Sequence, residues 1–348
     1  MPFLFVGSTG DKAGHSIITW ALARALLDRG LRVGFFKPFG TSSIQDGEIP
    51  SDADAVLFKK VLALEANLEL ICPYPLAPDI QAAFVPDDIH SEIASLAEVL
   101  ARGNDILLIM GSTHMFLDDA SHPAPDISVI DRLKTDLVVV HRFRKPSTTR
   151  YSLLSIGSLL KRRLKGIIIN RIPSSDFNEA ETSLAPSLTA HGMPITALLP
   201  EYPHLAFQSV AEAARVVDGE VLLGGELLDT AVGAMTVGTS VLPPPLALFK
   251  RVHNKLILLK PDDSGLKSGQ VAGVIITGGG KPGAGVAEAA RKAGVPLITA
   301  RSDTFACIER IEKNAGTLSY HHEQKVRGLT GIIEKGGGIE RLLSSLGL

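Results

Sequence analysis

The stretch FLFVGSTGDKAGHS, residues 3–16, decides the fold of the first half of this 348-residue chain. Its apolar residues Phe3–Val6 predict a buried strand, and the apolar spacing over Ile17–Asp28 predicts a helix. Glycines between the two let the backbone curl, so that successive N–H groups and the positive end of the helix face an anion. The stretch therefore predicts a phosphate-binding loop.

Two positions depart from the strict phosphate-loop pattern. Thr9 stands where the first glycine is expected, and His15 stands where lysine neutralises the outer phosphates of a nucleotide. A hydrogen bond to a charged group contributes about 1.5–3 kcal/mol, which corresponds to roughly ten- to a hundredfold in affinity. Two alternatives stay open: a protonated His15 or the nearby Lys12 partly holds an anion, or the loop is only a turn.

Further apolar runs, separated by helical stretches, predict a parallel sheet covered on both faces. The strands expected after the first are Arg32–Phe36, Asp105–Ile109, Asp136–Val140, Gly166–Ile169 and Ile195–Leu198. A break at Pro200–Pro203 indicates that this P-loop α/β domain spans residues 1–205.

A second, smaller α/β domain is expected over residues 206–348. Its expected strands are Glu220–Leu223, Leu256–Leu259, Val274–Thr277 and Leu297–Ala300, and its expected helices are Val210–Val216, Ala284–Ala293 and Asp303–Lys313. The glycine-rich tail from Gly336 onward is expected to be loosely held.

Composition narrows the class of protein. Hydrophobic residues make up 45% of the chain and the formal net charge is −2, so nothing calls for a nucleic-acid partner. The two cysteines, Cys72 and Cys307, are too far apart for a disulfide framework or a zinc motif. No apolar run approaches the roughly 20 residues that span a bilayer. We expect a cytoplasmic protein with no membrane partner.

Several short motifs occur in an order that resembles a known family. They are Ser8-Thr9-Gly10, Gly14-x-Ser16, Gly34-Phe35-Phe36-Lys37-Pro38 and Ser51-Asp52-Ala53-Asp54-Ala55. This order is similar to dethiobiotin synthetase. It is closer still to the synthetase-like N-terminal region of long phosphotransacetylases and their stand-alone relatives. A so-called DRTGG domain follows in that group, and Gly219–Leu222, Val274–Gly279 and Asp303–Phe305 resemble it.

The resemblance implies ATP and Mg²⁺ as cofactors and assigns roles to individual residues. Ser16 and Asp54 match the residues at the metal, and Lys37 matches the catalytic lysine that reaches substrate or phosphate. Asn170 matches the asparagine that reads the adenine edge. The implied loop contacts to the nucleotide come from Gly10, Lys12, Gly14, His15 and Ser16. The alternatives are purely structural roles, in which the aspartates only cap a helix and Lys37 only ends a strand.

Three features depart from the family pattern. His15 replaces the lysine, and Met110 stands where the synthetase has an acidic residue, although a thioether does not suit Mg²⁺. The signature of the second domain is not intact, and Lys260–Gly265 takes its place.

Together they predict a catalytically degenerate P-loop protein, regulatory or ligand-sensing, with at most weak binding of a nucleotide or an anionic small molecule. We expect a homodimer held by the second domain. The alternative is an ATP-dependent, Mg²⁺-requiring ligase of the dethiobiotin synthetase type that uses an altered loop.

Overall fold

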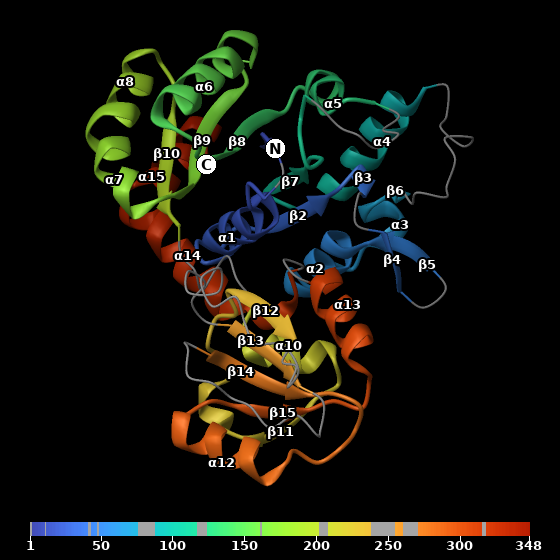
Figure 1. The fold of residues 1–348 in the computed structure, drawn as a ribbon. Coiled ribbons are helices and arrows are strands. Elements are labelled where there is room, and N and C mark those ends of the chain that lie inside the picture. The colour runs from blue at the N-terminus through green and yellow to red at the C-terminus, as the bar shows by residue number, and fades with distance from the viewer. Residues whose placement is uncertain are drawn as a thin grey trace. The chain divides into compact units, whose positions relative to one another are not determined.

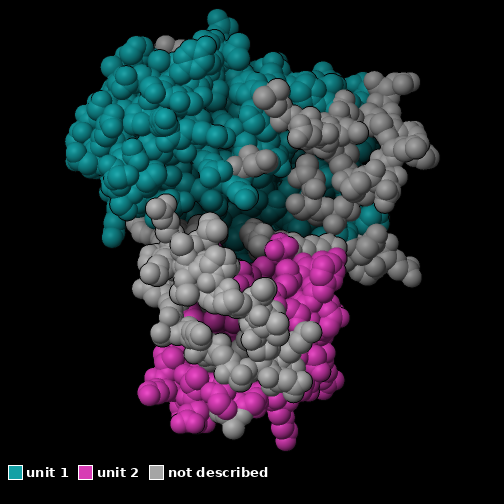
Figure 2. Space-filling view, viewed as in Figure 1, with its two compact units in different colours: residues 1–201, 318–348 teal, residues 202–317 magenta. Residues whose placement is uncertain are grey.

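The structure is a computed structural model in which the chain forms two compact units (Figures 1 and 2). Unit 1 comprises residues 1–201 and 318–348, and unit 2 comprises residues 202–317. The structure describes residues 2–10, 12–40, 43–46, 49–75, 88–116, 124–160, 162–201, 208–237, 255–259, 271–314 and 318–348. The segment Lys260–Gly265, expected at the place of the DRTGG signature, lies outside the described residues.

Unit 1 is built on a six-stranded sheet in the order β10-β9-β8-β1-β7-β2, and every neighbouring pair is parallel. Its strands are β1 (Phe3–Ser8), β2 (Val33–Phe36), β7 (Ile106–Met110), β8 (Asp136–Arg142), β9 (Leu164–Ile172) and β10 (Ile195–Pro200). Each expected strand of the first half is present. The central strands are almost wholly buried because helices cover the sheet, as near-continuous apolar runs predict.

Helices of unit 1 pack on this sheet in two groups. The first group is α1, α14 and α15, which contact one another in that order and also contact the sheet. The second includes α4 and α5, which contact each other as well as β1, β2 and β7. The helices are α1 (His15–Leu27), α2 (Ala53–Val61), α3 (Leu68–Ile71), α4 (Ile89–Ala101), α5 (Asp126–Leu133), α6 (Pro146–Leu160), α7 (Ser174–Glu179), the π-helix η2 (Ala180–Leu184), α8 (Ala185–Ala190), the 3₁₀-helix η4 (Tyr320–His322), α14 (Glu323–Lys335) and α15 (Gly338–Leu346).

Two small two-stranded sheets extend the region after β2. They pair β3 (Phe39–Gly40) with β6 (Tyr74–Pro75) and β4 (Ser43–Asp46) with β5 (Ile49–Asp52). The aromatic rings of Phe35 in β2 and Phe58 in α2 stack 4.0 Å apart and nearly parallel. This packing holds α2 against β2, and the residues at the start of α2 and after β2 form the candidate site described below.

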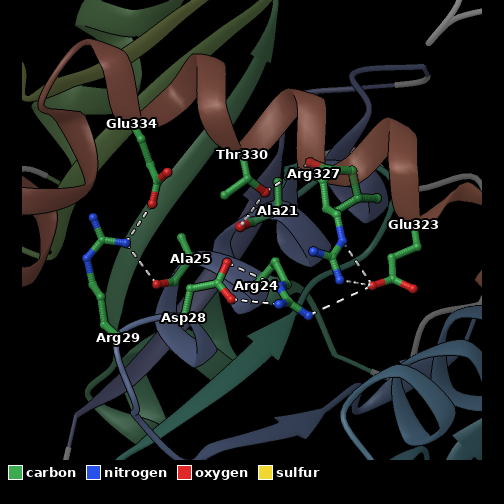
Figure 3. A network of polar contacts seen from close by, with 10 residues as sticks. Ala21, Arg24, Ala25, Asp28, Arg29, Glu323, Arg327, Thr330 and Glu334 are labelled. Carbon is green, nitrogen blue, oxygen red and sulfur yellow. Dashed lines mark hydrogen bonds and ion pairs between the residues drawn. The ribbon is translucent and has the colours of Figure 1, made fainter.

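The last 31 residues of the chain belong to unit 1, which differs from the expected division at residue 205. Figure 3 shows α14 lying along α1: Thr330 Oγ1 donates to the carbonyl of Ala21 at 3.3 Å, and Arg29 pairs with Glu334 at 2.7 Å. The expectation of a loosely held tail is wrong, because α15 packs on β9 and β10 with Ile339 and Leu342 buried.

Unit 2 carries a five-stranded sheet in the order β11-β15-β14-β13-β12. Among the described strands of this sheet, the edge pair β11–β15 is antiparallel and the other pairs are parallel. Its elements are α10 (Val210–Val216), β11 (Glu220–Leu223), the 3₁₀-helix η3 (Gly225–Leu227), β12 (Ala234–Val237), β13 (Lys255–Leu259), β14 (Val271–Ile276), α12 (Ala284–Ala293), β15 (Leu297–Thr299) and α13 (Thr304–Asn314). All strands expected here are present and β12 is an addition. The predicted fold class, a P-loop-type parallel sheet followed by a smaller α/β domain, is confirmed.

Candidate functional site: the loop between β1 and α1

The loop between β1 and α1 curls as the sequence predicts. Gly10, Lys12 and Gly14 have φ values of 143°, 58° and 84°, and α1 begins directly afterwards at His15. The N–H of Ala13 donates back to the carbonyl of Gly10 at 3.2 Å. Lys12 is exposed. A residue with a side chain is strained at such φ values, so the two glycines suit their positions and Lys12 holds an unfavourable one.

Asn170 at the end of β9 holds this loop from the side. Its Nδ2 donates to the carbonyl of Ala13 at 2.7 Å, and its Oδ1 accepts from the N–H of Arg171 at 2.8 Å. A Cβ at Gly14 would lie only 2.7 Å from Asn170 Nδ2, so a side chain at Gly14 would force the two apart. Asn170 therefore fastens the loop to the sheet. Reading an adenine edge stays a prediction.

A buried ion cluster lies beside the loop. The side chain of Lys37 is 1% exposed, and its Nζ lies 2.6 Å from Asp54 Oδ2 and 2.9 Å from Asp52 Oδ1. Asp52 is the N-cap of α2, because its Oδ1 also accepts from the N–H groups of Asp54 and Ala55. Ser16 Oγ donates to Asp54 Oδ2 at 3.2 Å. The structure thus brings Ser16, Lys37 and Asp54 together, as the resemblance implies, and adds Asp52.

Charges in this cluster are mutually stabilised. Burial disfavours the ammonium of Lys37, but Asp54 and Asp52 outweigh it, so the pKa of Lys37 lies above its ordinary value. Burial likewise opposes ionisation of Asp54, but Lys37 outweighs it and the pKa of Asp54 is lowered. One ammonium therefore faces two carboxylates at neutral pH.

His15, partly buried at the start of α1, does not replace the missing lysine in this structure. Burial is the largest effect on its pKa, and together with the positive charge of Lys37 it outweighs the opposite effects of Asp54 and Asp52, so the pKa falls from 6.5 to about 4. The ring is therefore neutral at pH 7. The alternative of a protonated His15 is not supported, because burial disfavours the charged ring more than the two neighbouring aspartates favour it.

Two residues beside the loop carry oxygen atoms of the kind that Mg²⁺ prefers. Mg²⁺ requires hard oxygen ligands, and the hydroxyl of Ser16 and the carboxylate of Asp54 provide two. Met110, at the expected place of a third, is a fully buried core residue at the end of β7. Within the described segments, no group of three His, Cys, Asp or Glu side chains is placed to hold a metal ion.

A second feature on the loop escaped the sequence analysis. Thr9 Oγ1 lies 2.9 Å from Nδ1 of His141, at the end of β8, and both line a pocket of about 440 Å³ together with Arg142 and Arg144. The only sequence signal was the run His141–Arg144 following an apolar strand, at the sheet edge where ligands of parallel sheets bind.

Comparison with known families agrees with this geometry. The family AAA_26, described as an AAA domain, matches residues 3–209, which is more than half of the chain. The chain belongs to the AAA_26 family. A DRTGG domain matches residues 212–314, which lie in unit 2.

Relatives with assigned names are similar over different lengths. A phosphate acetyltransferase of Deinococcus radiodurans is 25% identical over 89% of this chain but only 46% of its own length. The chain thus spans about half the length of that relative. An ATP-dependent dethiobiotin synthetase of Thermodesulfovibrio yellowstonii is 25% identical over 48% of this chain and 74% of its own length. The suspected architecture, a synthetase-like P-loop domain with a DRTGG domain, is confirmed.

Among solved structures, a MinD septum-site protein from Pyrococcus horikoshii with Mg-ADP is similar over 59% of this chain, at 17% identity and a TM-score of 0.34.

No helix within the described residues is both long and apolar enough to cross a membrane.

Proposed function

We propose that this protein is a regulatory or ligand-sensing member of the AAA_26 family whose loop binds a nucleotide or another anion at most weakly. The proposal rests on the charges of the side chains that surround the loop at neutral pH. One ammonium, Lys37, is held between the carboxylates of Asp52 and Asp54, and His15 is neutral. The side chains that would meet a phosphate therefore carry no net positive charge.

A phosphate at this loop is held by backbone N–H groups and by the end of α1, without the ammonium that other phosphate loops add. The exposed Lys12 is the remaining cation of the loop, and it extends from a strained backbone position rather than from the start of the helix. ATP and Mg²⁺ remain the cofactors that the family resemblance favours, and both would bind weakly or not at all.

Replacing His15 with lysine tests this proposal. We expect wild-type protein to bind MgATP with a dissociation constant weaker than about 100 µM, and His15→Lys to bind at least tenfold more tightly, from the charge-assisted hydrogen bond that lysine adds. Isothermal titration calorimetry measures both. His15→Gln, which adds no charge, is the matched control and should bind no more tightly than wild type. Micromolar binding by wild type would contradict the proposal.

A second candidate function is an ATP-dependent ligase of the dethiobiotin synthetase type. The contacts among Ser16, Lys37 and Asp54 favour it, because these residues match the synthetase positions and meet in space. In such an enzyme Lys37 and His15 would contact the transferred phosphoryl group, and Asn170 the base. Release of ADP with a diamine and bicarbonate, abolished by Asp54→Asn, would establish the ligase and overturn the regulatory proposal.

A further inference from the structure

The pocket beside Thr9 has the size and the lining of a small-molecule site. Its volume of about 440 Å³ falls within the range of ligand pockets, roughly 300–1,000 Å³. Its lining residues come mainly from the end of β8, the turn that follows it and α6, all in unit 1. The lining has a basic end and an apolar side. We call this site the β8–α6 pocket and define it by Thr9, His141, Arg142, Arg144, Tyr151 and Leu159.

Among the described residues, only one of the two ring nitrogens of His141 has a hydrogen-bond partner. The residue is 5% exposed, and its Nδ1 contacts Thr9 Oγ1 at 2.9 Å. Its Nε2 is buried with no hydrogen-bond partner in the described part of the chain. Buried polar atoms of native proteins nearly always have a partner, so an unpaired ring nitrogen in a pocket wall indicates a group that the pocket receives.

Positive charge gathers at the same end of the pocket. Arg142 and Arg144 both line it, and no ion pair of either is found among the described residues. Arg171, on the neighbouring strand, has its pKa lowered by burial and by the charge of Arg142, with Glu201 opposing. Arg171 is not part of the pocket lining, and the two arginines that are suit the binding of a carboxylate or a phosphate.

The part of the lining that α6 contributes includes two exposed apolar side chains. Tyr151 is 76% exposed and Leu159 is 71% exposed, although both are large side chains. They lie eight residues apart on α6 and share one helix face with Ser155 between them. Two large apolar side chains in the same lining as two arginines suit a ligand with an anionic half and an apolar half.

We propose that the β8–α6 pocket binds an anionic small molecule with an apolar body, such as a carboxylate or a phosphate monoester. The anionic group lies against Arg142 and Arg144 and accepts from the Nε2–H of His141, in the tautomer whose Nδ1 accepts from the hydroxyl of Thr9. The body lies along Tyr151 and Leu159. This site is separate from the cluster of Lys37 and Asp54, and it does not depend on nucleotide binding at the loop. Its occupant would contact Thr9, where the loop begins.

Calorimetric titration with octanoate and with octyl phosphate tests the site, and octanol is the uncharged control. We expect one or both anions to bind once per chain, with octanol at least tenfold weaker. The tighter of the two identifies carboxylate or phosphate as the preferred group. Arg142→Ala/Arg144→Ala should weaken the anion by at least ten- to a hundredfold, from the charge-assisted bonds lost. The matched control Arg102→Ala/Arg162→Ala removes two exposed arginines outside the pocket and should change affinity less than twofold.

A second variant keeps the basic end intact. Tyr151→Ala/Leu159→Ala removes exposed side chains, so the variant should still fold. It should bind octanoate at least fivefold more weakly than wild type. The preference for anions over octanol should remain. Thermal unfolding checks that each variant is folded. Failure of both anions to bind at millimolar concentration, equal binding of octanol, or equal weakening by the control variant would each overturn the proposal.

Discussion

Lys37 is the residue on which the candidate site depends most, because it balances two buried carboxylates. An ammonium that is 1% exposed would be unstable alone, and Asp52 and Asp54 would be unstable without it. The same contacts limit what Lys37 offers a ligand, since its charge is already shared. A phosphate would have to compete with Asp54 for the Nζ atom.

Lys37→Met should therefore destabilise the protein strongly. Removing one partner of a buried ion cluster leaves an uncompensated charge, which costs about 3–5 kcal/mol of unfolding free energy. Urea denaturation measures the change. The exposed Lys335→Met is the control and should shift stability by less than about 0.5 kcal/mol. Adding Asp54→Asn to Lys37→Met should recover part of the loss; an unchanged midpoint in Lys37→Met would show that the cluster contributes nothing.

Acid should weaken the fold between pH 6.5 and about 4. Burial lowers the pKa of His15 and of His141 to about 4, so the unfolded chain binds more protons in this window and stability falls as the pH falls. The limiting slope is about 1.4 kcal/mol per pH unit for each group. Asp54 behaves differently because its pKa is lowered. Its contribution to the unfolding free energy is complete above pH 3.8, its ordinary pKa, and is lost only at more acid pH.

Urea midpoints from pH 7.5 to 4 measure this dependence. His141→Gln removes one of the two groups and should flatten the curve, whereas His191→Gln, at an exposed site, should leave its slope unchanged. A wild-type midpoint that stays constant down to pH 4.5 would contradict the burial of both rings in their neutral form.

At the scale of elements, α1 links the loop to the C-terminal helices. Helix α1 begins at His15, directly after the loop. It packs against α14, which in turn contacts α15. Ion pairs reinforce this contact at its edge: Arg29 of the turn after α1 reaches both Glu334 and Glu340, at 2.7 and 2.5 Å. Exposed pairs contribute little individually, so the buried faces of the helices supply most of the stability.

Gly338 is where α15 comes closest to the sheet. A Cβ at this position would overlap the carbonyl oxygen of Thr196 in β10, which is backbone and cannot easily move. We expect Gly338→Ala to destabilise unit 1 by about 1–3 kcal/mol, as overpacking does. Gly336→Ala is the matched control, because a Cβ there meets nothing within 4 Å and φ is −82°. Equal urea midpoints for the two variants would show that α15 does not pack as described.

The C-terminal helices were missed in the sequence although the signal was present. Val326, Leu329 and Ile333 repeat at helical spacing and form the buried side of α14. The glycines at 336–338 suggested a loose tail, but Gly337 has a φ of 62° and serves the turn between two helices. Local composition was a poor guide here, because a distant surface, that of α1, covers the helix.

At the scale of the molecule, unit 2 is an insertion between β10 and the last helices of unit 1. The matched DRTGG domain, residues 212–314, falls inside that insertion. Both ends of the insertion thus lead into unit 1, and one of them leads directly to the helix beside α1. Homodimer formation through residues 206–348 and a cytoplasmic location stay predictions of the sequence.

Deleting the insertion tests this division. A chain that joins residues 1–201 to 318–348 through a flexible Gly/Ser linker should fold cooperatively, since it keeps the whole of unit 1. A chain that ends at residue 201 should unfold at a markedly lower temperature or aggregate, because the face of α1 around Trp20 and Ala21 loses its cover. Circular dichroism melting compares them. Equal stability of the two chains would show that residues 318–348 do not belong to unit 1.

The sequence by itself determined the six strands of the sheet of unit 1, the loop after β1 and the identity of the residues at Ser16, Lys37, Asp54 and Asn170. Periodicity and glycine placement are local properties, so they can be read along the chain. Only the tertiary structure decided that Asp52 shares Lys37, that His15 is neutral, that Asn170 fastens the loop and that His141 and Arg142 form a pocket with α6. Charge balance and burial depend on which side chains meet in space, and residues far apart in sequence supply them.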